Sequence, residues 1–139
     1  MDIQTVARFY AELNKDNLNR LAEIYHQDVV FEDAAHRIEG YSALLTYFQK
    51  LYKNVDRCQF VISEEYQCDG TGFLIWNMHL QHPSLAGGNT VTVNGISQVK
   101  FADGKVIYHR DYFDLGEMLY EQLPLLGSII KKIKQRLGQ

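Results

Sequence analysis

The sequence predicts an α+β protein, because its helical and strand-like segments are grouped along the chain instead of alternating. Helical periodicity dominates residues 3–52, and long strand-like stretches follow between residues 58 and 113. The pair Asp103-Gly104, flanked by strand-like sequence, is typical of a tight hairpin. Strands that follow one another through short turns favour an antiparallel sheet, and the early helices can cover one of its faces.

Three amphipathic helices are expected in the first part of the chain. Apolar residues recur at helical spacing over residues 3–13, over residues 18–25, where Tyr25 belongs to the apolar face, and over residues 41–52. A short strand at residues 29–31 separates the second helix from the third. This part of the chain therefore provides helices that can pack against a sheet.

Four long strands are expected at residues 59–67, 73–82, 90–101 and 105–113. A helix that begins at Asp114 follows them, and Pro124 interrupts it because proline removes a backbone donor. A last helix combines an apolar stripe with basic residues. We expect a main domain over residues 1–123 and a basic amphipathic C-terminal helix over residues 124–139.

Length and composition are those of one globular domain. A chain of 139 residues can bury a real hydrophobic core. No apolar run approaches the roughly 18 residues of a membrane span, and the polar N-terminus lacks the pattern of a secretory signal. We therefore expect a cytoplasmic protein. Cys58 and Cys68 should be free thiols, because a strand about 30 Å long separates them.

The net charge of −3 is distributed unevenly along the chain. Residues 128–139 contain four basic residues and no acidic residue, so the rest of the chain carries a net charge of −7. An acidic body of this kind argues against general binding of nucleic acids.

The segment 93–114 contains a glycine, a strand, an Asp-Gly-Lys turn and then a His-x-Asp sequence. This order resembles the last hairpin of SnoaL-like proteins, a branch of the nuclear transport factor 2-like superfamily. Phe31, Asp33 and Trp76 also stand where the family has similar residues. The resemblance spans about residues 3–123. It implies a curved antiparallel sheet wrapped around the N-terminal helices, which forms a cone with an internal pocket.

The resemblance leaves two classes of function open, since fold alone does not decide function. The first is a cofactor-independent acid/base enzyme, such as an isomerase, cyclase, dehydratase or hydrolase, that acts on a small apolar carbonyl compound. The second is a non-catalytic module of the same fold that binds a ligand or a protein. Neither class requires a cofactor.

The strongest catalytic candidates are His109 and Asp111. Residues two apart on a strand face the same side, so Ile107 and Phe113 should share their face, while Arg110 points to the other. The resemblance implies that the face with Asp111 lines the pocket and that this aspartate is the acid/base, with His109 tuning it. A carboxylic acid in an apolar cavity can exchange protons near neutral pH. The alternative is a buried His–Asp hydrogen bond that only braces the sheet.

Asp33 is the second catalytic candidate, because in the family this position lies near the mouth of the cone. Its alternative role is local, since aspartate readily binds backbone N–H groups in loops. His36, three residues later, is expected to be a solvated loop residue. The expected pocket walls, which would bind an apolar ligand, are Trp76, Tyr25, Phe113 and Phe31.

No metal site is expected. His79 and His82 are three residues apart on one strand and should face opposite sides, whereas a catalytic zinc ion needs about three convergent protein ligands. The pattern leaves open whether Trp76 or His79 faces the pocket. The Asp–Arg–Asp arrangement of related epoxide hydrolases is not expected, because Arg110 and Asp111 point to opposite faces.

The other face of the last strand would carry Tyr108, Arg110 and Tyr112. An aromatic-rich outer sheet face indicates an interface, so we expect a homodimer. The C-terminal helix is expected to pack on its own domain or on the second copy. Contact with an anionic membrane and docking of another partner are the less favoured alternatives.

Overall fold

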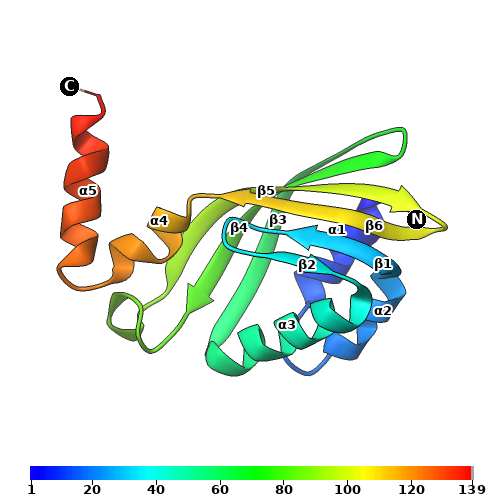
Figure 1. Ribbon diagram of the computed structural model, residues 1–139, viewed down its shortest axis with the longest axis horizontal. Coiled ribbons are helices and arrows are strands. Elements are labelled where there is room, and N and C mark those ends of the chain that lie inside the picture. The colour runs from blue at the N-terminus through cyan, green and yellow to red at the C-terminus, as the bar shows by residue number, and fades with distance from the viewer. Residues whose placement is uncertain (139) are drawn as a thin grey trace.

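The computed structural model describes residues 1–138 and confirms the α+β class. An open, curved sheet forms the body, and the first three α-helices lie on one side of it (Figure 1). The α-helices are α1 (Ile3–Glu12), α2 (Leu21–Ile24), α3 (Tyr41–Asn54), α4 (Leu115–Met118) and α5 (Leu126–Arg136). Three short 3₁₀ segments are η1 (Leu18–Arg20), η2 (Ala86–Gly88) and η3 (Tyr120–Gln122).

Six strands form the sheet in the order β2-β1-β6-β5-β4-β3. Their bounds are β1 (Tyr25–Glu32), β2 (Arg37–Glu39), β3 (Arg57–Cys68), β4 (Thr71–Gln81), β5 (Val91–Ala102) and β6 (Lys105–Phe113). The four long strands pair as an antiparallel meander, as predicted. The pair of β1 and β6 is parallel. It joins the N-terminal part of the chain to its last strand.

Helix α1 shows how the sequence sets the inner layer. The Asp2 side chain accepts a hydrogen bond from the backbone N–H of Thr5 at 2.9 Å and so caps the first turn. The buried residues of this helix share one face, which packs on β3 and β4. They are Ile3, Val6, Ala7, Phe9 and Tyr10.

Burial alternates along β4 and shows which of its side chains face the core. Trp76 is buried with the other inward residues of the strand, whereas His79 lies on the outer side and bonds Thr92 at 3.0 Å. The strand ends at Gln81, so the prediction that His82 belongs to it is wrong. His82 instead begins the loop that leads to η2.

Two further predictions are wrong, one about the element that contains Tyr25 and one about the face of Ile107. Tyr25 was expected on the second helix, but α2 ends at Ile24 and Tyr25 begins β1. Ile107 was expected to share a face with His109, but an irregularity in the pairing of β5 with β6 shifts the register. The core therefore includes Val106 instead of Ile107.

The C-terminal part begins as predicted, with Asp114 accepting a hydrogen bond from the N–H of Glu117 at 3.2 Å. The expected helix is broken earlier than Pro124, into α4 and η3. In the described part of the chain, no helix is long and apolar enough to cross a membrane. Cys58 and Cys68 are free thiols, as predicted.

Candidate active site

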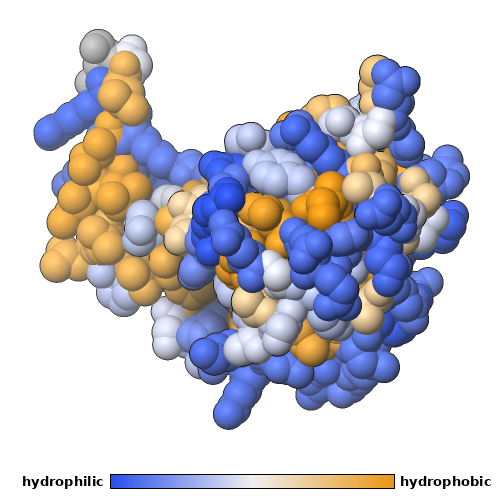
Figure 2. All heavy atoms as spheres, turned by 45° about the vertical axis from the view of Figure 1, so that its right-hand side comes forward, coloured by the Kyte–Doolittle hydropathy of each residue, from blue (hydrophilic) through white to orange (hydrophobic). Residues whose placement is uncertain are grey.

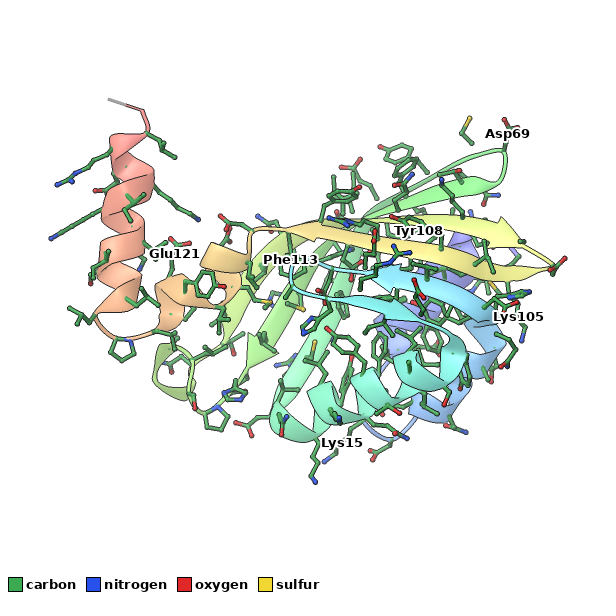
Figure 3. The ribbon with its side chains drawn as sticks, viewed as in Figure 1. Lys15, Asp69, Lys105, Tyr108, Phe113 and Glu121 are labelled. Carbon is green, nitrogen blue, oxygen red and sulfur yellow. The ribbon has the colours of Figure 1, made fainter. Side chains whose placement is uncertain are left out.

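A cavity of about 440 Å³ lies between the inner face of the sheet, α3 and the segment from α4 to η3. Its walls are mainly apolar and aromatic. Three of the four expected wall residues line it: Phe31 from β1, Trp76 from β4 and Phe113 from β6. Figure 3 follows β6 from Lys105 through Tyr108 to Phe113, which lies at the end of the strand nearest α4. A concavity with apolar walls and few polar groups is the usual form of a small-molecule site.

Asp111 is one of two carboxylates in the cavity wall, the other being Asp33. Its Oδ1 atom lies 2.6 Å from Nε2 of His109, which is only 1% exposed. Because an ionised carboxylate can only accept hydrogen bonds, Nε2 is the donor to the Asp111 carboxylate. The structure thus brings together the two residues that the sequence pattern singled out.

A chain of hydroxyl groups continues behind His109. Nδ1 of His109 lies 2.7 Å from the Tyr25 hydroxyl, which in turn is hydrogen-bonded to the Tyr10 hydroxyl. Burial raises the pKa of both Tyr10 and Tyr25 well above its ordinary value, so both phenols keep their protons. The Tyr25 hydroxyl can donate to a neutral His109 or accept from a protonated one, so the chain accommodates both forms.

A second chain reaches Asp111 from the neighbouring strands. The Ser97 hydroxyl donates to Oδ1 of Asp111 at 2.5 Å, and the indole N–H of Trp76 donates to the Ser97 oxygen at 2.9 Å. Ser97 is directly opposite Asp111 in the pairing of β5 with β6. Two chains of donors therefore converge on one carboxylate oxygen and fix its orientation.

The other carboxylate oxygen of Asp111, Oδ2, is available to a bound molecule. Within residues 1–138, Oδ2 takes part in no hydrogen bond, and the side chain is 15% exposed. An ionised carboxylate has about four acceptor positions, so Oδ2 can accept a proton or a hydrogen bond from a bound molecule. The arrangement can therefore hold a base at the cavity wall.

Asp33 lines the same cavity, with its side chain 8% exposed. It accepts hydrogen bonds from the backbone N–H groups of Ala35 and His36 at 2.8 and 2.7 Å, which is the expected loop chemistry. It also accepts one from the Tyr47 hydroxyl at 2.7 Å. Burial, and then this contact, raise the pKa of Tyr47. Both oxygens are engaged, so Asp33 is less free to react than Asp111.

Several residues occupy places that the sequence did not indicate. Tyr25 is fully buried behind His109 and does not line the cavity, so it supports the site from behind. His36 lies at the cavity wall, bonded to Asp33, with a side chain that is 53% exposed. His82 also lines the cavity.

The sequence did not indicate a role in the site for Tyr10, Ser97 or Tyr47. Ser97 is the only one with a visible signal, since it is a polar residue among small and apolar inward residues of its strand. Tyr10 and Tyr47 look like ordinary apolar positions of amphipathic helices, and only their hydroxyl partners reveal a second role. As for metals, residues 1–138 contain no group of three or more His, Cys, Asp or Glu side chains that could hold an ion.

Comparison with known proteins identifies the family of this chain. The model of the SnoaL-like domain family matches residues 6–109, which is most of the chain. The chain therefore belongs to the SnoaL-like domain family. No curated protein matches the sequence.

Solved structures share the fold at low sequence identity. A candidate SnoaL-like polyketide cyclase from Shewanella denitrificans is 22% identical, with a TM-score of 0.70 over 83% of this chain and 92% of its own. A protein of ketosteroid isomerase-like fold from Catenulispora acidiphila, solved with trimethylamine, is 14% identical, with a TM-score of 0.77 over 89% and 96%. A candidate hydroxylase from Streptomyces galilaeus is 16% identical, with a TM-score of 0.65 over 88% and 90%. At these identities the likeness shows the fold alone.

Proposed function

We propose that the protein binds a small apolar carbonyl compound in its cavity and acts on it as a cofactor-independent acid/base enzyme, with Asp111 as the catalytic residue. One observation carries the proposal. The Asp111 carboxylate is held by donors on Oδ1 and offers Oδ2 at the wall of an apolar cavity of about 440 Å³.

The chemistry follows from that geometry. Oδ2 takes a proton from a carbon next to the carbonyl group, and the electrons of that C–H bond move into an enolate. The resulting carboxylic acid returns the proton to the same carbon or to another atom of the enolate. A positioned acid or base of this kind contributes about 10²- to 10⁴-fold in rate.

His109, Ser97 and Tyr25 are positioning residues in this proposal. His109 and Ser97 are hydrogen-bonded to Asp111, and Tyr25 is hydrogen-bonded to His109. Together they fix the carboxylate relative to the bound molecule. Because catalysis depends on groups held close to their reacting geometry, a fixed carboxylate is worth more than a mobile one. Trp76 and Phe113 would contact the apolar part of the ligand.

The substrate class follows from the walls. They offer aromatic and aliphatic surface and no lysine or arginine, so they favour a neutral or weakly polar molecule over a phosphate or a carboxylate. The family resemblance and neighbours named as candidate polyketide cyclase and ketosteroid isomerase-like protein support a cyclic carbonyl compound.

The test is hydrogen exchange in D₂O. The protein is mixed with a panel of small cyclic ketones, and NMR follows deuterium uptake at the carbons beside each carbonyl. We expect uptake with the wild type and at least a 100-fold slower rate with Asp111→Asn. Asp103→Asn is the matched control, because Asp103 lies in the β5–β6 turn with a side chain that is 82% exposed.

The outcomes separate the two classes of function. Exchange that proceeds equally fast in Asp111→Asn would contradict the catalytic role. Specific binding without exchange would contradict the enzyme and favour the non-catalytic ligand-binding module. A cavity that binds none of the ketones would contradict the proposed substrate class.

We also propose that the protein forms a homodimer through the outer face of the sheet. Two large apolar side chains on that face are strongly exposed, Ile96 at 42% and Tyr112 at 52%. They are directly opposite each other in the pairing of β5 with β6, so they form one continuous patch. Light scattering that finds a monomer at every concentration tested would contradict this.

A further inference from the structure

Helix α5 stands apart from the body, at the end of the molecule opposite the N-terminus (Figure 1). Two contacts hold it to the preceding segment. Lys134 pairs with the carboxylates of Asp114 and Glu121, and Gly127 packs so closely on the backbone of Glu121 that a side chain would not fit. The helix is therefore fixed in place and packs chiefly against η3, not against the sheet.

An apolar stripe runs along this fixed helix and faces solvent. Figure 2 shows apolar side chains gathered on it. Residues spaced three and four apart share one face of a helix, and here they are strongly exposed. The exposed fractions are 79% for Leu125, 39% for Leu126, 46% for Ile129, 53% for Ile133 and 84% for Leu137. The expectation that this helix packs on its own domain does not account for the stripe.

The charges beside the stripe are all positive. From Gln122 onward the sequence contains no acidic residue. Lys134 is paired with the body, whereas Lys131, Lys132 and Arg136 form no ion pair within residues 1–138. The stripe is thus an apolar surface flanked by three available cations.

The outer face of β4, β5 and β6 also carries exposed apolar side chains, with an acidic residue beside them. Residues 58–99 contain three acidic residues and no lysine or arginine. Ile75, Ile96 and Tyr112 follow one another across β4, β5 and β6 in register, and Glu64 on β3 is directly opposite Ile75. The nearby Arg110 is already paired with Glu32 at 2.9 Å. This face therefore offers an apolar row with Glu64 at its β3 border, while Lys100 lies further along β5, over the ring of Tyr108.

We propose that the α5 stripe of one copy docks on the outer face of β4, β5 and β6 of a second copy, with the cations of α5 near Glu64, and that the exchange is mutual. The inference rests on the proposed dimer and adds the element that holds it together. Pairing of two α5 helices would bring like charges together, whereas the body without residues 128–139 carries a net charge of −7. The same negative body opposes docking on an anionic membrane.

The first test measures the monomer–dimer Kd of the full chain by sedimentation. Ile133→Glu places a charge in the stripe and should raise Kd at least tenfold, whereas Gln135→Glu, on the polar side of the same helix, should leave it within about twofold. A dimer that Ile133→Glu does not weaken would overturn the role of α5 while leaving the dimer itself in place.

The second test locates the contact. Chains with Ile133→Cys and chains with Ile96→Cys, both carrying Cys68→Ser, are mixed and oxidised. A covalent dimer that forms only in the mixture is expected, and Gln135→Cys in place of Ile133→Cys should give much less. Cross-linking of Ile133→Cys chains to one another without a mixed product would overturn the proposal. So would a wild-type monomer that sediments with phosphatidylserine vesicles.

Discussion

Trp76 and Gly95 are directly opposite each other on β4 and β5, and the indole ring fills the space that a side chain at position 95 would need. The close approach lets the indole N–H reach the Ser97 hydroxyl, two residues further along β5, at 2.9 Å. The absence of a side chain at Gly95 thus positions the indole N–H of Trp76, which is connected to Asp111 through the Ser97 hydroxyl.

Gly95→Ala should therefore push the indole away from Ser97. We expect a loss of about 1–3 kcal/mol in the free energy of unfolding, the usual cost of overpacking. Trp76 is the single tryptophan, so its fluorescence reports both the displacement and the urea transition. Gly70→Ala is the control, because a Cβ atom there would have its nearest neighbour at 4.0 Å. Equal stability of the two variants would contradict the tight packing.

Tyr25→Phe should destabilise the protein by removing the hydroxyl that joins Tyr10 to His109. Nδ1 of His109, a residue only 1% exposed, would lose its partner. An unpaired buried polar group costs about 1–3 kcal/mol, which urea denaturation can measure. Tyr66→Phe should change stability by less than about 0.5 kcal/mol, since this side chain is 56% exposed. Matching transitions for both variants would rule out a structural role for the chain of hydroxyls.

The acid stability of the fold should depend on Glu32. Hydrogen bonds from Tyr108, Arg37 and Arg110 lower its pKa from 4.5 to about 2. A lowered pKa in the folded state contributes stability above pH 4.5, and that contribution is lost as the pH falls towards 2. Thermal midpoints of wild type and Glu32→Gln should therefore differ most above pH 5 and converge near pH 2.

Glu12→Gln is the matched control for that series, because Glu12 pairs with Arg20 through a side chain that is 61% exposed. Its midpoints should follow those of the wild type at every pH. A Glu32→Gln curve that runs parallel to the wild-type curve down to pH 2 would count against the lowered pKa.

The two thiols should differ in reactivity. Burial raises the pKa of Cys58 to about 11, whereas Cys68 is exposed at the end of β3. Because the thiolate is the nucleophile, iodoacetamide at pH 8 should modify Cys68 first. Peptide mass spectrometry measures the two rates, and a short urea pulse that opens the fold should make them similar. Equal rates in the native protein would refute the burial of Cys58.

Sequence periodicity was sufficient for the long elements of the fold. β4, β5 and α3 bury enough apolar side chains in a regular pattern for the period to be visible. Tyr25 was assigned to a helix because it lies at helical spacing from Leu21, yet the chain becomes extended at this residue. The period of so short a helix does not show where it ends, since element boundaries depend on tertiary pairing.

Within the site, the pair His109 and Asp111 could be predicted because both residues lie on one strand. Ser97 could not be placed opposite Asp111, because counting back from the turn at Asp103-Gly104 sets it against Arg110. The irregularity between Lys100 and Phe101 moves the register by one residue, and nothing in the alternation of apolar residues marks it. The contacts of Tyr10 and Tyr25 join distant parts of the chain and leave no local pattern.

The parallel pairing of β1 with β6 also determines when the protein can fold during its synthesis. Residues 25–32 leave the ribosome early, but their neighbour in the sheet ends at Phe113. Until then β1 has only the short β2 beside it, and Tyr25 lacks His109. The nascent chain must keep an apolar strand edge unpaired while most of the domain is translated, which makes sheet closure a late, slow event and an opportunity for chaperone binding.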